Sequence, residues 1–297
     1  MSSVLAVDVG GTNIKCALFD RNLEILESRN LETPPHDATG KSVISAITTL
    51  TDELRKFHEI KSIGLAVPGT LDEPAGITRW AGNLGWKNIP VVSMLQESVG
   101  LPIAFKHDVR TGALAELRKG AMKGYTNGIF LPIGTGIACA IVLDGEIRSS
   151  DGFAGEVGHV DVNSDRVCVC GKTGCLEATS STLAISKAYE ALNGKKKTTV
   201  EIVKAIDTDS IARKVYDEAI SGLVRAAEIL ATIIAPEVIV LGGGLSMVGP
   251  RLISNLRERL DKELTFQRKP QIVSSKFGIE SGMYGCGIMA WELVDGR

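Results

Sequence analysis

Four potential metal ligands lie close together between Gly155 and Glu177. One imidazole and three thiols fall within seventeen residues, contributed by His159, Cys168, Cys170 and Cys175. This set is complete for a tetrahedral Zn²⁺ site, with bonds of about 2.3 Å to sulfur and about 2.0 Å to nitrogen. A site whose four positions are all filled by the protein is typical of structural zinc, because catalytic zinc leaves one position open for water. The cluster therefore predicts a structural zinc loop, and a redox-active Cys-x-Cys pair is the alternative.

Two glutamates flank the predicted zinc ligands. Glu156 and Glu177 are suited to accept hydrogen bonds from the hydroxyls of a sugar-like substrate. His159 would connect metal and substrate, since one ring nitrogen on the metal fixes the imidazole and the other can donate to a hydroxyl. The pattern favours a zinc that organises a substrate pocket without taking part in catalysis.

Three glycine-rich turns are candidate phosphate sites: Asp8–Thr12, Gly134–Gly136 and Gly242–Ser246. Glycine lets the backbone approach a phosphate, and successive N–H groups can donate to its oxygens. Asp8 ends an apolar run and could hold Mg²⁺ directly or through water. Each turn alone could be a plain tight turn. Three such turns at strand ends favour a bound nucleotide.

Asp108 lies between a predicted strand and a predicted helix, in the run FKHDVRTGALAEL. One interpretation is helix N-capping, which aspartate does well. The other is a general base that accepts the proton of an attacking hydroxyl during phosphoryl transfer. The residues alone leave both open.

The order of elements indicates an internally duplicated α/β protein. Val7–Asp20 aligns with Leu131–Asp144 without a gap, so that strand, glycine turn, strand and terminal aspartate superpose. Strands and helices alternate through the rest of the chain, which favours mixed sheets covered by helices. The expected helices are 42–58, 91–99, 111–119, 183–192, 215–234, 250–264 and 283–294.

Composition narrows the class of protein. A length of 297 residues favours two domains, and a net charge of -2 gives no reason to expect nucleic acid or an anionic membrane as a partner. The start shows no signal-peptide pattern and no apolar run reaches the ~20 residues of a membrane span, so a cytoplasmic location is expected. Cys16, Cys139 and Cys286 are expected to be reduced core residues, and Lys195–Lys197 a solvated loop.

Several motifs together resemble one family. They are DVGGTNIK, AGNLGW, LPIGTGIACAIVLDGEI, AGEVGH, CVCGKTGCLEATSS and LGGGLS. Over essentially its whole length the chain resembles the ROK (repressor, open reading frame, kinase) sugar kinases of the actin-like ATPase superfamily. The resemblance implies a duplicated actin-like (ribonuclease H-like) ATPase fold of two α/β domains with a cleft between them. Residues 1–110, with a C-terminal helix 284–297 packing back on them, would form one domain, and residues 111–283 with the zinc loop the other.

The resemblance implies ATP-dependent phosphorylation of a hexose 6-hydroxyl, with glucose the first choice and N-acetylmannosamine or N-acetylglucosamine the alternative. Asp108 would be the general base, and the cofactors would be ATP, Mg²⁺ and structural Zn²⁺. The sugar would contact Asn83, His107, Asp108, Glu156, His159 and Glu177. The donor would contact Asp8, Gly10, Gly11, Thr12, Lys15, Gly134, Thr135, Gly136, Gly243 and Gly244. A homodimer is also implied, and polyphosphate stays open as a second donor.

The chain departs from the family pattern around the implied base. The family commonly has Asn-Asp-Ala-Asn, whereas this chain has His107-Asp108-Val109-Arg110. His107 either keeps the sugar contact of the first Asn or replaces it with a longer, titratable donor. Arg110 could approach the phosphates or pair with an acid. Family repressors carry a DNA-binding domain before the first motif, and only three residues precede Val4 here, which disfavours a repressor. A non-catalytic sugar sensor and an actin-like filament protein are also disfavoured.

Overall fold

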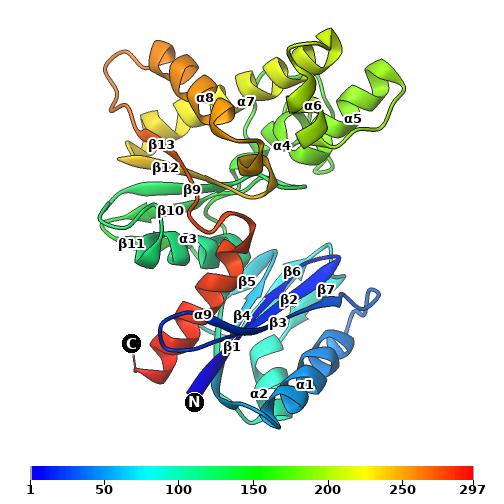
Figure 1. The fold of residues 1–297 in the computed structure, drawn as a ribbon, viewed down its shortest axis with the longest axis vertical. Coiled ribbons are helices and arrows are strands. Elements are labelled where there is room, and N and C mark those ends of the chain that lie inside the picture. Colours follow the sequence, from blue (N-terminus) through cyan, green and yellow to red (C-terminus); the bar gives the residue numbers. More distant parts are fainter. Residues whose placement is uncertain (1, 297) are drawn as a thin grey trace. The chain divides into compact units, whose positions relative to one another are not determined.

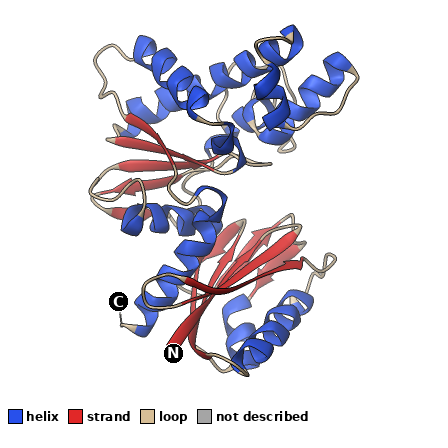
Figure 2. Ribbon diagram, viewed as in Figure 1, coloured by secondary structure: helices blue, strands red, loops and turns tan. Residues whose placement is uncertain are grey.

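The computed structural model describes residues 2–296, apart from the side chain of Met247 (Figures 1 and 2). Contacts divide the chain into two compact units. Unit 1 comprises Met1–Glu116, Ser149–Ala154 and Glu280–Arg297, and unit 2 comprises Leu117–Arg148 and Gly155–Ile279. The domain boundaries expected from the sequence, 110/111 and 283/284, stay a prediction about independently folding parts.

A five-stranded mixed sheet forms the centre of unit 1, in the order β3-β2-β1-β4-β8. The central strand β1 carries a run of apolar residues, Val4–Val7, that are completely buried because both faces of the sheet are covered. β1 pairs antiparallel with β2 and parallel with β4. The strands are β1 Ser2–Val9, β2 Asn13–Phe19, β3 Ile25–Glu32, β4 Glu59–Val67 and β8 Ile103–His107.

Helices cover both faces of this sheet (Figure 1). Apolar residues of α1 and α2 pack on one face, and α9 packs against β1 and β4. The contact with α9 is close because small residues meet there: a Cβ at Gly64 would lie 2.0 Å from the Cys286 carbonyl oxygen. The three covering helices are α1 Lys41–Arg55, α2 Val91–Val99 and α9 Ser281–Val294, whereas α3 Asp108–Lys119 follows β8 and ends in unit 2. A small antiparallel sheet adds β5 Thr70–Asp72, β6 Ile77–Ala81 and β7 Trp86–Ile89.

Unit 2 repeats the same sheet order with β11-β10-β9-β12-β13. As in unit 1, the first three strands pair antiparallel and the last two add in parallel. The turns differ by one residue, since Val9 pairs with Ile14 whereas Ile133 pairs with Ile137. The gapless sequence alignment is therefore off by one in strand pairing. The strands are β9 Gly128–Pro132, β10 Ala140–Leu143, β11 Glu146–Arg148, β12 Val238–Gly242 and β13 Gln271–Ser274.

The helices of unit 2 pack around the long, central α7, whose apolar residues join the core of the unit. α7 starts at Ser210, five residues before the expected start, because the Asp209 side chain caps it by accepting from the N–H groups of Ile211 and Ala212. The helices are α4 Leu176–Ser180, α5 Thr182–Asn193, α6 Thr199–Ala205, α7 Ser210–Ile234 and α8 Pro250–Glu263. Short 3₁₀ turns are η1 Val157–His159, η2 Gly244–Val248 and η3 Gly278–Glu280.

Candidate functional site

The turn between β1 and β2 is fixed from outside by the segment that follows β3. The Thr33 hydroxyl donates to the Gly10 carbonyl oxygen at 2.7 Å, and the Thr33 N–H donates to the Thr12 carbonyl oxygen at 2.9 Å. Gly11 lies against the expected sugar loop, since a Cβ there would be 3.1 Å from the Cβ of Asn83. Unit 1 therefore brings its phosphate turn and Asn83 together.

Asp8 lies near the end of β1, next to this turn. Burial and the charge of Asp108, partly opposed by Lys15, together raise the pKa of its carboxyl to about 7. Lys15 lies opposite Asp8 in the β1–β2 register. A buried carboxylate with a carboxylate neighbour is a set of hard oxygen donors of the kind that Mg²⁺ prefers, and a divalent cation would favour its ionised form. The arrangement fits the expected magnesium role.

Asp108 is the first residue of α3 and stays partly accessible. Its side chain is 35% exposed, and its Oδ1 accepts from the N–H of Val109 at 2.7 Å. An N-cap bond would instead come from an N–H two or three residues further on. His107 Nδ1 lies 3.1 Å from the same oxygen, and its side chain is 10% exposed. Among the described residues, the Asp108 carboxylate therefore makes no N-cap hydrogen bond. N-capping was the alternative to a role as general base for this residue.

In unit 2, the four predicted zinc ligands converge. The ligand atoms of His159, Cys168, Cys170 and Cys175 all lie within 4.8 Å of one another. His159 Nδ1 is 3.8 Å from Cys168 Sγ, and Cys170 Sγ is 3.6 Å from Cys175 Sγ. Tetrahedral ligands with metal–sulfur bonds of about 2.3 Å are separated by about 3.8 Å, so the cluster fits zinc. The structure has all six cysteines as free thiols.

Backbone hydrogen bonds shape the loop that carries these ligands. The Cys168 N–H donates to the Lys172 carbonyl oxygen at 2.8 Å, and the Gly171 N–H donates to the Cys168 carbonyl oxygen at 3.0 Å. Gly171 has a φ of 89°, a conformation that glycine adopts without strain. Because His159 Nδ1 faces the sulfurs, Nε2 is turned toward Glu156, 4.0 Å from its Oε2. The second ring nitrogen is thus left for another partner.

Glu177 supports the second glycine turn. Its Oε2 accepts from the Ile137 N–H at 2.8 Å, and a Cβ at Gly136 would lie 2.8 Å from the same oxygen. The third glycine loop adjoins this turn, because Ile133 accepts from the Leu245 N–H at 3.0 Å and donates to Gly242 at 3.0 Å. Unit 2 thereby joins two of the three predicted phosphate turns and one predicted sugar ligand.

A cavity of about 610 Å³ opens beside these two turns. Thr135 and Gly244 contribute the glycine loops, and the remaining lining residues come from α5, α6 and the segment between them. They are Thr182, Leu183, Ser186, Lys196, Lys197, Thr198, Thr199, Val200 and Glu201.

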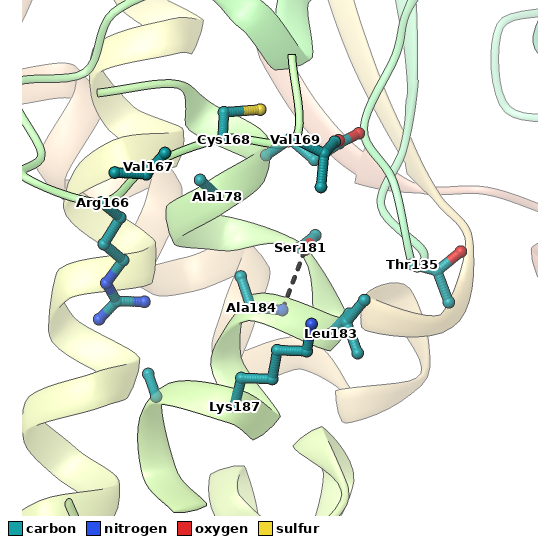
Figure 3. A pocket seen from close by; sticks show the side chains of 12 residues that line it. Thr135, Arg166, Val167, Cys168, Val169, Ala178, Ser181, Leu183, Ala184 and Lys187 are labelled. Atoms are coloured by element: carbon teal, nitrogen blue, oxygen red, sulfur yellow. Dashed lines mark hydrogen bonds between the residues drawn. The ribbon is translucent and has the colours of Figure 1, made fainter. Parts of the chain in front are cut away.

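A second cavity of about 330 Å³ separates the zinc loop from α4 and α5 (Figure 3). Arg166, Cys168 and Val169 come from the loop, opposite Leu183 and Lys187. The Ser181 hydroxyl, also seen in Figure 3, caps α5 by accepting from the Ala184 N–H at 3.1 Å. The same helix, α5, therefore lines both the 610 Å³ and the 330 Å³ cavity.

Comparison with known proteins supplies the family. The ROK family model matches residues 4–292. The chain belongs to the ROK family. It is 33% identical to a glucokinase of Halalkalibacterium halodurans, over 86% of this chain and 84% of that protein. It is 30% identical to an N-acetyl-D-glucosamine kinase of Histophilus somni, over 95% and 97% of the two chains.

A solved ROK structure matches the whole architecture. A ROK family glucokinase from Streptomyces griseus, in complex with glucose and AMPPNP, superposes with a TM-score of 0.83 at 25% identity. The match covers 98% of this chain and 99% of that one. The α/β class and the duplicated actin-like ATPase fold predicted from the sequence are thus confirmed. Among the described residues, no helix of this ROK protein has the length and apolar character needed to cross a membrane.

Two features of this ROK protein were missed by sequence reasoning. Glu73 binds Arg110, with Arg110 Nε 2.8 Å from Glu73 Oε1, so the arginine that replaces the usual asparagine pairs with an acid. No motif pointed to Glu73. The run Lys195–Lys197 lies in a loop with Lys195 and Lys196 exposed, as predicted, but the 610 Å³ cavity that Lys196 and Lys197 also line was not predicted. The capping box Thr198–Glu201 was the available signal, since it starts a helix at the edge of this cavity.

Proposed function

We propose that this protein is an ATP-dependent sugar kinase that phosphorylates the 6-hydroxyl of a hexose, with glucose as the preferred substrate. The geometry of Asp108 carries the proposal, because its accessible carboxylate at the start of α3 is not used as an N-cap. The glucokinase relative at 33% identity and the glucose- and AMPPNP-bound structure support the reaction and its substrates.

In the proposed reaction, Asp108 accepts the proton of the sugar 6-hydroxyl as its oxygen attacks the γ-phosphate. In unit 1, Asn83 and His107 hold sugar hydroxyls, Asp8 supports Mg²⁺, and Gly10–Thr12 with Lys15 bind phosphate oxygens. Magnesium, when bound, neutralises charge on the phosphates. Positioning and electrostatic stabilisation supply most of the catalysis in such a reaction.

Unit 2 contributes binding groups. Glu156, His159 and Glu177 hold sugar hydroxyls, and the backbone of Gly134–Gly136 donates to phosphate oxygens. The 610 Å³ cavity lined by Gly244 is the proposed place of the nucleoside, since it lies next to the phosphate turn and also has Thr135 in its wall. Zinc on His159, Cys168, Cys170 and Cys175 would fix the imidazole of His159 and stabilise its loop.

A second substrate class has support of its own. The N-acetyl-D-glucosamine kinase relative shares 30% identity with this chain, so an N-acetylhexosamine is the alternative acceptor. A homodimer and a cytoplasmic location complete the proposal, on the resemblance to the family.

An ADP-release assay tests the proposal. Purified protein with ATP and Mg²⁺ would be offered glucose, mannose, fructose, N-acetylglucosamine and N-acetylmannosamine, and the product identified as the 6-phosphate by NMR. We expect the highest kcat/KM with glucose. A higher kcat/KM with an N-acetylhexosamine would make that sugar the assigned substrate instead of glucose. If no sugar led to ADP release, the kinase assignment would be refuted.

A further inference from the structure

Glu73 is held in a well-anchored turn of unit 1. It follows β5, and the Asp72 carboxylate accepts from the Ala75 N–H at 3.2 Å. The turn closes with a hydrogen bond from the Gly76 N–H to the Glu73 carbonyl oxygen, also 3.2 Å. The Val92 N–H of α2 then donates to the Gly76 carbonyl oxygen at 3.2 Å. The backbone that carries the Glu73 side chain is therefore fixed on two sides.

The Glu73 carboxylate binds three groups in the segment that contains Asp108. Its Oε1 accepts from the backbone N–H of His107 at 3.1 Å and from Arg110 Nε at 2.8 Å, and its Oε2 lies 3.3 Å from Lys106 Nζ. These partners, together with Glu73, are called the Glu73 cluster below. They lie on both sides of Asp108 in the sequence.

The position of the segment in the sheet explains why it needs such a partner. β8 is an edge strand that pairs only with β4 among the described strands, and His107 is its last residue. Backbone N–H groups on the free side of an edge strand have no ladder partner. The Glu73 carboxylate supplies one for His107, just before the chain turns into α3.

The Glu73 cluster contains a buried ion pair. The Arg110 side chain is only 3% exposed, and its Nη2 is buried without a hydrogen-bond partner among the described residues. Burial tends to raise the pKa of Glu73, but Lys106 and Arg110 outweigh it and hold that pKa below its usual value. Glu73 is therefore the anion that compensates a buried guanidinium, and losing one member of such a pair is costly.

We propose that Glu73 is a positioning residue for the reaction: it fixes the end of β8 and the start of α3 so that Asp108 faces the acceptor hydroxyl. This inference rests on the proposed function, because it assigns a role relative to Asp108 as base. Small displacements of a catalytic group can lower turnover by about 10²-fold, so the cluster would act mainly on kcat.

Kinetics of Glu73→Gln and Glu73→Ala test the role. The amide of Gln keeps one acceptor oxygen and Ala keeps none, so we expect kcat to fall by about 10-fold and about 100-fold respectively. The KM for ATP should stay within two-fold, which a general loss of structure would not allow. Asp72→Asn is the matched control in the same turn, since the Asn side-chain oxygen can still accept from the Ala75 N–H. Asp72 also binds Arg79 and not the residues around Asp108. We expect its kcat to be normal.

Glu73→Ala leaves Arg110 buried without its anion, which destabilises the fold, so Glu73→Ala/Arg110→Leu is measured as well. This variant removes both charges, and we expect kcat to remain low while the thermal midpoint recovers. A kcat restored to the wild-type value would show that the cluster only stabilises the fold, and would overturn the positioning role.

Amide hydrogen exchange, read by mass spectrometry, gives a result that does not depend on sugar turnover. In the Glu73 variants we expect faster exchange over His107–Arg110, and in Asp72→Asn no change there. Unchanged exchange in Glu73→Ala would overturn the inference even if the protein proves to be a kinase. An inactive wild-type protein would refute the proposed function, while the exchange would still decide whether Glu73 orders this segment.

Discussion

The two units share one sheet order but differ in the side chains that surround their glycine turns. Both place a glycine turn between their first two strands, yet the turn spans four residues between Val9 and Ile14 and three between Ile133 and Ile137. In unit 1 the turn follows Asp8, whose pKa is raised by burial and by the charge of a second carboxylate, Asp108. In unit 2 it is supported by the single carboxylate of Glu177.

The difference suggests a division of labour after duplication. Neighbouring carboxylates that differ in environment suit proton transfer and metal binding, so we propose unit 1 as the place of the chemistry. Unit 2 combines backbone N–H donors, a cavity and a metal-ligand cluster, which suit binding. The predictions below test this assignment.

Asp108→Asn should have the largest effect. The amide cannot accept the proton, so we expect turnover to fall by about 10²- to 10⁴-fold with glucose binding nearly unchanged. Asp52→Asn, at an exposed carboxylate of α1, is the control. Steady-state kinetics and isothermal titration with glucose measure the two quantities. Near-normal turnover in Asp108→Asn would contradict the base assignment.

Zinc removal should act on unit 2 alone. Metal analysis should find about one zinc per chain, and chelation or Cys175→Ser should weaken sugar binding and lower the thermal midpoint of unit 2 by several degrees. Trp80, Trp86 and Trp291, the three tryptophans of the chain, all lie in unit 1. The unfolding transition of unit 1, followed by tryptophan fluorescence, should therefore be unchanged. Circular dichroism should detect the lower thermal midpoint of unit 2.

Two other outcomes of zinc removal would be decisive. An equal shift of the tryptophan transition would show that the units do not respond separately. If turnover were lost while sugar binding and both unfolding transitions stayed unchanged, the zinc would have to take part in catalysis.

Lys196→Ala should weaken the binding of ATP, the phosphate donor. If Lys196 contacts the nucleotide in its cavity, losing one such contact should cost about 1 kcal/mol, a rise of roughly five-fold in the KM for ATP at constant kcat. Lys195→Ala is the control, because Lys195 belongs to the same run but does not line the cavity. Equal effects of the two variants would indicate only the general charge of the loop. Repeating the assay with polyphosphate would show whether that donor is used.

The smallest expected effect concerns how the unfolding free energy of unit 1 depends on pH. The pKa of Glu73 is held below its usual value in the folded protein, so its ionised form stabilises the fold above the unfolded pKa of about 4.3. That contribution is lost as the pH falls through the folded pKa. Urea unfolding followed by tryptophan fluorescence between pH 6 and pH 3.5 should therefore be less pH-dependent in Glu73→Gln than in wild type. Glu97→Gln, at an exposed position of α2, should resemble wild type.

Elements with strong local patterns were predictable. The hairpin of β1 and β2, its repeat in β9 and β10, and the long α7 follow from alternating or helical apolar spacing, which depends only on neighbouring residues. The small sheet β5–β7 and α6 were not predicted, because they are short and their polar or mixed segments resemble loops. The one-residue difference between the turns was likewise invisible, since hydrogen-bond register depends on the strand partner.

The sequence by itself determined the chemical inventory: a Cys3His ligand set, three glycine turns and an aspartate between a strand and a helix. Residue type and short spacing are sufficient for such statements. Only the tertiary structure decided that Arg110 pairs with Glu73, that Glu177 supports the Gly136 turn, and that Lys196 lines a cavity. The first two pairs are 37 and 41 residues apart in the chain, and folding brings them together to satisfy a buried charge and a backbone N–H group. Lys196 shares its cavity with Thr135 and Gly244, which are about 50 to 60 residues away in the chain.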